Sequence, residues 1–359
     1  MHKRAQWTTL AAALVFALAT PAEAGTTEPA RNDAATPRVG RFAIRTKTLF
    51  SPIPAGLKHV DFWVAAPYSD DHQKTFQFMI FSGYNAQTFE LTDPGTVVAY
   101  MQGGPRGGVP LSAQTSIYVE RFEEIHATLT PGEVKPLSEE EKRLMERWLK
   151  PDPTGMTAKE LKSMANRITS GIKNPVGKAR AIYEHLVVKM TLKEGNAKLS
   201  EGGVGDLAAT FKQMTGSSID IAAGFVALCR AVGVPARTVT GLKIPAGLRT
   251  GQLRDYHGWA EFYAEQIGWV PVDPAEASRN PAKREYYFGS LDERRVGISK
   301  GREITLAPPQ AGPPLNYLVT AYWEGDSKPM RDPSQDVSFE EVDEIPQRDG
   351  ITMVPTTPK

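Results

Sequence analysis

The feature that most constrains this fold is a short segment that is apolar on every face of a helix. Residues 221–229 read IAAGFVALC, and a helix that is apolar all round has to be buried. Ser217 and Ser218 precede it with side chains suited to helix capping, and Gly233 followed by Pro235 ends it. The sequence therefore predicts one interior helix, capped by Ser217 or Ser218, around which a domain must pack.

The N-terminus has the three parts of a secretory signal. The basic run MHKR is followed by the apolar run LAAALVFALA and by AEA, a small-x-small cleavage motif. We expect a signal peptide at residues 1–24, cleavage after Ala24 and a flexible polar leader at residues 25–39. No later apolar run approaches the ~20 residues that span a bilayer. We therefore expect a periplasmic or secreted mature chain without an integral membrane segment.

Charge and cysteine content narrow the kinds of partner and of stabilising bond. Lys and Arg total 42 against 41 Asp and Glu, and this balance gives no reason to expect nucleic acid or an anionic membrane as a partner. Cys229 is the one cysteine in the chain, so no intramolecular disulfide can form. Stability must then come from packed cores, and the oligomeric state is left open.

The rest of the chain divides by its secondary-structure pattern. Residues 40–130 hold short runs of β-branched and aromatic residues separated by turn-forming clusters, which predicts an antiparallel β-sandwich. Residues 131–325 begin with segments whose apolar residues recur every three or four positions, which predicts helices ahead of the buried one. Residues 326–359 are polar, and within this tail only DVSFEEV has the pattern of a short strand.

Two strand-like runs follow the buried helix and carry a histidine and an aspartate. HGWAEFYA opens with His257 and GWVPVD ends with Asp273, and together they predict a hairpin. If Tyr263 pairs with Trp269, Asp273 lies on the same face as His257 and within reach of a hydrogen bond. A symmetric four-residue loop would instead point the carboxylate away, so the orienting role of Asp273 depends on this register.

These strings resemble those of the transglutaminase-like family, the bacterial branch of the papain-type fold, and FVALCRAVGVPAR, HGWAEFY and GWVPVDP carry the resemblance. It implies an α+β fold, with the buried helix packed on an antiparallel sheet behind a β-sandwich, and no cofactor. It also implies a cysteine nucleophile at the tip of that helix, a histidine opening the next strand and an aspartate ending the one after. Counting back from Arg230 places the nucleophile position at Ser218, while His257 and Asp273 match their counterparts directly.

Other residues receive weaker assignments. Ser217 and Trp259 are expected at the substrate site, Trp259 as one wall, and Gln213 is a candidate second donor for an oxyanion. Cys229 cannot replace the missing thiol, because it lies about three helical turns beyond Ser218. Four histidines of the expected mature chain lie outside the proposed site and have no metal-ligand spacing, so the sequence indicates no metal: His59, His72, His126 and His185.

Two functions agree with this set of residues. In the first, which we prefer, the cleft carries Ser218, His257 and Asp273 in place of a Cys-His-Asp set and binds a peptide or amide ligand with little or no catalysis, as a pseudoenzyme. In the second, Ser218 is an active nucleophile in acyl transfer or hydrolysis of a peptide or amide bond. A third possibility, a structural subunit that uses the sandwich as a contact surface, has no distinguishing motif.

Overall fold

The computed structural model describes residues 36–91, 96–105, 111–126, 129, 137–152, 155–193, 207–265, 267–319, 321–331, 333–346 and 352–355. The predicted signal peptide at residues 1–24 and most of the predicted leader at residues 25–39 lie outside these ranges. The described residues from Pro37 onward belong to one structural unit. Within the described ranges, no helix is both long enough and apolar enough to cross a membrane.

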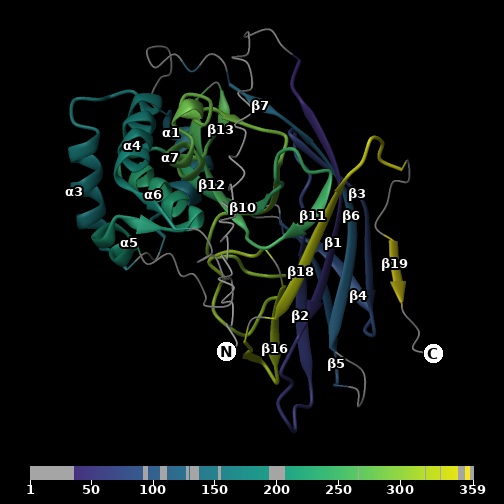
Figure 1. Cartoon of the computed structure of the whole chain (residues 1–359). Helices are drawn as coiled ribbons and strands as arrows, with labels where there is room; N and C mark the ends of the chain where they lie inside the picture. The colour runs from purple at the N-terminus through teal and green to yellow at the C-terminus, as the bar shows by residue number, and fades with distance from the viewer. Residues whose placement is uncertain are drawn as a thin grey trace, which may run out of the picture. The chain divides into compact units, whose positions relative to one another are not determined.

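Two sheets with a shared core make up a β-sandwich (Figure 1). The six-stranded sheet contains, in spatial order, β11 (Thr250–Leu253), β18 (Ser334–Glu341), β1 (Val39–Leu49), β6 (Ser112–Phe122), β3 (Gln73–Ser82) and β19 (Thr352–Pro355). The five-stranded sheet contains β17 (Lys328–Pro329), β16 (Ala321–Gly325), β2 (Val60–Ala66), β5 (Val97–Gly103) and β4 (Ala86–Glu90). Phe42 and Ile117 from the first sheet share one buried cluster with Phe62, Met101 and Trp323 from the second.

The sandwich is not confined to residues 40–130, the range that the sequence suggested for it. β16 pairs with β2, and β18 pairs with β1 over eight residue pairs. β18 contains all of the DVSFEEV run of the predicted polar tail except its last residue, and its Val337 and Phe339 are buried in alternation with more exposed neighbours. Alternation predicts such a strand, but the distant strand with which it pairs has no local signature in the sequence.

A second structural layer surrounds the predicted interior helix, α6 (Ser218–Ala231). The four-stranded sheet beside it contains, in spatial order, β13 (Gly268–Val272), β12 (His257–Ala264), β10 (Ala236–Lys243) and β15 (Arg295–Lys300). The other helices are α1 (Glu139–Leu144), α2 (Glu146–Leu149), α3 (Ala158–Ile168), α4 (Pro175–Lys189), α5 (Leu207–Gln213) and α7 (Pro274–Arg279). Short elements complete the layer: β7 (Glu124–Ile125) with β14 (Ser290–Leu291), β8 (Thr191–Leu192) with β9 (Thr215–Gly216), and η2 (Pro281–Lys283). The predicted α+β class is confirmed.

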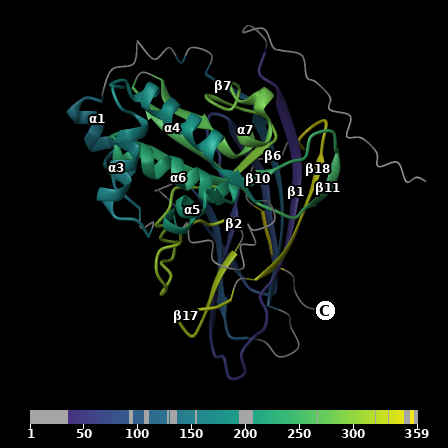
Figure 2. The same ribbon diagram turned by 60° about the vertical axis from the view of Figure 1, so that its left-hand side comes forward.

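The four-stranded sheet contributes to two cores. Ala260 and Phe262 of β12 pack in the same cluster as α6, which Figure 2 shows among α3, α4, α5 and β10. Leu242 of β10 and Val296 of β15 belong instead to the sandwich core. Because the same sheet supports both clusters, α6 and the strands after it are held against a continuous apolar interior.

Candidate active site

The N-terminus of α6 is fixed by a capping box. Ser217 is the N-cap: its Oγ accepts a hydrogen bond from the Asp220 N–H at 3.2 Å, and the Asp220 carboxylate accepts one from the Ser217 N–H at 2.9 Å. This reciprocal pair satisfies two backbone donors that a helix start leaves open. Ser218 is therefore the first residue of the helix rather than its cap, and its side chain is available for another contact.

His257 and Asp273 meet across the hairpin of β12 and β13. Tyr263 lies opposite Trp269, the register that brings the two side chains to one face. His257 Nε2 lies 2.7 Å from Asp273 Oδ2. Asp273 also caps α7, because its Oδ1 accepts the Glu276 N–H at 2.9 Å. The carboxylate is thus held by two elements at once.

Charge around Asp273 keeps it ionised in spite of its complete burial. Burial alone would raise the pKa of this carboxyl, but the adjacent imidazole, the Arg295 guanidinium and the Glu276 N–H together hold that pKa below its ordinary value. Arg295 is 2% exposed, and its Nε lies 3.5 Å from Asp273 Oδ2. With an ionised acceptor at Nε2, a neutral His257 ring carries its proton there. Its Nδ1 is then the nitrogen that can accept a proton.

Ser218 is tied to the strand that carries His257. The Gly258 N–H donates a hydrogen bond to Ser218 Oγ at 3.1 Å. A Cβ at position 258 would lie 2.7 Å from the Ile219 Cα, so only glycine lets the strand come this close to the helix start. The close approach, rather than an unusual backbone conformation, explains why a glycine follows His257.

A cavity of roughly 390 Å³ opens beside these groups. Ser217, Ser218 and His257 line it together with Gln252 and Leu253 from β11. The charged residues of its lining are Lys193, Lys243, Arg254, Asp255 and Arg279. Lys243 is paired with Glu276, whereas Lys193 and Arg254 are exposed, so the lining keeps positive charge that favours a ligand with negative charge.

The other residues predicted for the site lie elsewhere. Trp259 is 1% exposed and stacks on the His257 ring, with centroids 6.3 Å apart, so it supports the imidazole from inside and does not form a cavity wall. Gln213 is exposed at the end of α5 and is not part of the cavity lining. Cys229 is fully buried, and burial raises the pKa of its thiol well above the usual value.

Three supporting residues escaped sequence reasoning: Gly258, Glu276 and Arg295. The string DPAE at residues 273–276 has an N-cap aspartate, a proline at the first helical position and a glutamate two residues later, which is a helix-start signal that could have been read. Arg295 has no such signal, because β15 lies next to β10 only in three dimensions.

The described residues near the site could in principle hold a metal, but their charges are already paired. His257, Asp273 and Glu276 bring ligand atoms within 4.8 Å of one another. Arg295 contacts both carboxylates, at 3.5 Å for Asp273 and 3.3 Å for Glu276, and the Lys243 ammonium also contacts Glu276. Two bound cationic side chains leave little negative charge for an ion.

Comparison with known proteins identifies this region. Residues 162–274 match the family model described as the transglutaminase-like superfamily. An uncharacterized protein of Haemophilus influenzae is 27% identical over 216 residues, which cover 52% of this chain and 58% of that protein. The uncharacterized protein YebA of Bacillus subtilis is 30% identical over 96 residues, 24% of this chain and 12% of YebA. The chain thus matches only part of the length of either relative.

One solved structure is similar over most of both chains. It is a candidate cysteine protease from Cytophaga hutchinsonii, with a TM-score of 0.57 and 16% sequence identity over 88% of this chain and 95% of that one. At this identity the likeness concerns the fold alone. Together with the family match, it identifies residues 162–274, which include α6, His257 and Asp273, as a transglutaminase-like domain.

Proposed function

We propose that this protein binds a peptide or amide ligand in the cavity beside Ser218 and that it catalyses little or no reaction there. The observation that carries the proposal is the hydrogen bond from the Gly258 N–H to Ser218 Oγ at 3.1 Å. It gives the hydroxyl a structural task at the position where the family resemblance expects a cysteine nucleophile. We infer that Ser218 holds the helix start against β12 and does not attack a carbonyl.

The chemistry of a hydroxyl supports this inference. A cysteine at a helix N-terminus beside an imidazolium can ionise at neutral pH, whereas a serine hydroxyl is far too weak an acid to do so. A serine nucleophile needs a base that takes its proton during attack and donors placed for the oxyanion. In a site shaped for the larger sulfur atom, a serine oxygen lies too far from both the imidazole and the substrate carbonyl. A misplacement of about 1 Å can lower the rate on the order of a hundredfold.

The lining of the cavity suggests the class of ligand. β11 forms one edge of the six-stranded sheet and contributes Gln252 and Leu253 to the cavity. An extended peptide can add to such an edge through main-chain hydrogen bonds. The basic lining residues then favour a peptide that carries carboxylates. We therefore propose an extended acidic peptide as the ligand.

A second candidate function is slow acyl transfer or hydrolysis with Ser218 as the nucleophile. The observation in its favour is the complete support of His257, whose Nε2 lies 2.7 Å from the buried Asp273 carboxylate. In this mechanism the hydroxyl proton passes to His257 as the oxygen attacks a carbonyl, and the imidazolium returns it to the leaving amine. Asp273 orients the ring throughout.

One pair of variants separates the two functions. A serine-directed phosphonate probe is added to the full chain and to Ser218→Ala, and the site of labelling is read by mass spectrometry. Our proposal expects no labelling at position 218. Labelling of the parent that disappears in Ser218→Ala would reject the binding-only function and establish the acyl-transfer candidate.

Two further variants test the scaffold itself. Ser218→Cys should gain reactivity toward a thiol-directed probe, because the helix start and His257 favour a thiolate. Binding to an array of acidic peptides should fall in His257→Ala, and undiminished binding would move the ligand away from this cavity. His185→Ala, an imidazole on α4 outside the cavity lining, is the matched control.

We also propose that the protein is exported. The signal-like sequence at residues 1–24 is the support for this proposal. N-terminal sequencing of the protein recovered from the exported fraction of a bacterial host should give Gly25 as the first residue. Recovery of the uncleaved chain from the cytoplasm would contradict it.

A further inference from the structure

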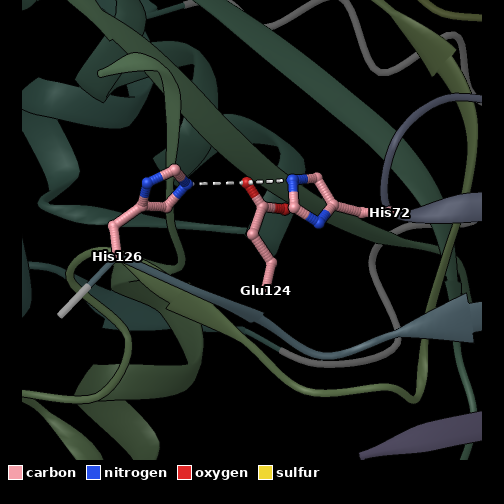
Figure 3. A group of neighbouring side chains, drawn as sticks. All are labelled: His72, Glu124 and His126. Atoms are coloured by element: carbon pink, nitrogen blue, oxygen red, sulfur yellow. Dashed lines mark hydrogen bonds and ion pairs between the residues drawn. The ribbon is translucent and has the colours of Figure 1, made fainter. Parts of the chain in front are cut away.

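Two histidines and a glutamate gather at the end of the sandwich, outside the candidate active site. His72 lies in the turn between Asp70 and Gln73, ahead of β3, Glu124 lies on β7, and His126 follows β7. Figure 3 shows the two imidazoles on either side of Glu124, both directed at the same carboxylate oxygen. His126 Nε2 lies 3.1 Å from Glu124 Oε1, and His72 Nε2 lies 3.6 Å from it.

The residues of this cluster are held in place by a buried arginine and by backbone contacts. Arg121 donates from one terminal nitrogen to the His72 carbonyl at 2.8 Å and from the other to Glu124 Oε2 at 3.4 Å. The His126 N–H donates to the Gly289 carbonyl at 2.9 Å. Glu124 is 5% exposed. Arg121 therefore fixes one carboxylate oxygen and leaves the other, Oε1, to the two imidazoles.

The spacing fits an ion better than a set of direct hydrogen bonds. At 3.6 Å, His72 Nε2 is too far from Oε1 for a hydrogen bond. The three ligand atoms all lie within 4.8 Å of one another. A tetrahedral ion bound at about 2.0–2.2 Å separates neighbouring ligand atoms by roughly 3.3–3.6 Å, so small side-chain shifts would complete the geometry.

We propose that His72, Glu124 and His126 bind one divalent transition-metal ion, with Zn²⁺ as the best match. Two imidazole nitrogens and one carboxylate oxygen are ligands that Zn²⁺ accepts, whereas Ca²⁺ and Mg²⁺ prefer a shell of oxygens. The side chain of His72 is 38% exposed, which leaves a path for the ion and for a water molecule as its fourth ligand. The hydrogen bond from Arg121 to Oε2 orients the ligating carboxylate, as partners of metal ligands commonly do.

The ion would stabilise a junction between the sandwich and the candidate active site. His126 is bonded to the Gly289 carbonyl, and the Gly289 N–H donates to Pro271 of β13, the strand that leads to Asp273. The ion would tie the turn before β3 to this same segment. By mass action, the protein with the ion bound should therefore be more stable than the metal-free protein.

Calorimetry on the full chain tests this site. The protein is treated with EDTA, dialysed and titrated with ZnCl₂, and its melting temperature is followed with and without the ion. We expect one Zn²⁺ per chain and a rise in melting temperature, with no comparable response to Ca²⁺ or Mg²⁺. His72→Ala, His126→Ala and Glu124→Gln should each weaken Zn²⁺ binding at least tenfold.

Matched controls make the outcome decisive. His59→Ala removes an imidazole whose Nε2 lies 3.2 Å from Asp61 Oδ1, a single histidine–carboxylate pair, and it should leave Zn²⁺ binding unchanged. His257→Ala should also leave it unchanged. The proposal is overturned if the parent binds no Zn²⁺, or if His257→Ala abolishes binding while His72→Ala does not. Because His72 is the most exposed of the three ligands, a normal circular dichroism spectrum is expected for His72→Ala, and this keeps the test valid if Glu124→Gln fails to fold.

Discussion

Asp273 and Glu124 are both buried carboxylates beside imidazoles, yet their surroundings differ. Asp273 receives one imidazole, one guanidinium and one backbone N–H, from three separate elements. Glu124 receives a guanidinium on one oxygen only, and two imidazoles converge on the other. Both carboxylates have partners for both oxygens, but only Glu124 directs one oxygen and two ring nitrogens toward a common point.

Because of this difference, Asp273 is suited to orient a histidine ring, whereas Glu124 is suited to ligate an ion. The fixed partners of Asp273 suit a carboxylate that holds one ring in one tautomer. Imidazoles can give up their protons and ligate a metal, which a guanidinium cannot. The same pair of residue types therefore leads to different chemistry, and the number of imidazoles that converge on each carboxylate, one at Asp273 and two at Glu124, decides which.

The largest expected effect comes from removing the more completely enclosed carboxylate. Asp273→Ala should lower the free energy of unfolding by about 3–5 kcal/mol, because it leaves the Arg295 guanidinium with one carboxylate fewer in a fully buried place and also removes the cap of α7. Glu124→Ala should cost less, since the buried Arg121 keeps its hydrogen bond to the His72 carbonyl and no helix loses its cap. Urea denaturation followed by tryptophan fluorescence measures both.

Asp273→Asn is the control that separates charge from capping. It keeps an oxygen for the Glu276 N–H but not the negative charge, so it should be about 1 kcal/mol more stable than Asp273→Ala. Equal losses in the free energy of unfolding for Asp273→Ala and Glu124→Ala would contradict the predicted difference between the two carboxylates.

Lowering the pH from 7 to 3 should reduce the extra stability of the parent relative to Asp273→Asn. The folded pKa of Asp273 is depressed, so between the folded and unfolded pKa values the unfolded chain binds more protons than the folded one. The stabilisation is then fully present above the unfolded value, about 3.9, and is lost as the pH falls through the lower folded value. Urea titrations at pH 7, 5, 4 and 3 should show a difference that is constant down to about pH 5 and then shrinks. A difference that grows on acidification would contradict the assigned direction.

A smaller loss is expected where β12 meets α6. Gly258→Ala places a methyl group 2.7 Å from the Ile219 Cα, so the strand and the helix start must move apart, at a cost of about 1–3 kcal/mol. The same shift should weaken peptide binding in the cavity without affecting Zn²⁺ binding at His72 and His126. Gly104→Ala, on the exposed end of the sandwich, places its methyl group 3.3 Å from the Lys58 carbonyl oxygen, a milder contact, and should lower stability less than Gly258→Ala. Calorimetry with each ligand compares the two sites in one variant.

Local patterns were sufficient for the parts of this chain that local physics determines. The all-round apolar segment gave the interior helix, and the serines before it gave the helix start, with Ser217 rather than Ser218 as the cap. The hairpin of β12 and β13 was predicted as well, but its register was left open between two loop lengths, and the structure has the one that pairs Tyr263 with Trp269. In each case the decisive contacts lie within a few residues along the chain or across one short loop.

Long-range pairing explains what the sequence did not reveal. β18 lies beside β1 almost 300 residues away, and His72 reaches His126 only because β3 pairs with β6 and brings the turn before β3 to β7. The histidine spacing along the chain therefore had no resemblance to a ligand motif. Gln213 lies exposed at the end of α5 and outside the cavity lining, a placement that depends on packing that the sequence does not specify.

The smallest expected effect concerns the basic lining of the cavity. Lys193→Gln and Arg254→Gln each remove one exposed positive charge, and an exposed charge contributes less than about 1 kcal/mol. Binding of an acidic peptide should weaken about two- to threefold in each variant, and the difference should fade as the salt concentration rises from 50 to 500 mM because screening shortens the reach of the charges. Lys159→Gln on α3, outside the cavity lining, removes the same charge and should leave peptide affinity unchanged. Fluorescence anisotropy measures all three, and an equal loss in Lys159→Gln would mean that net charge rather than the cavity lining attracts the peptide.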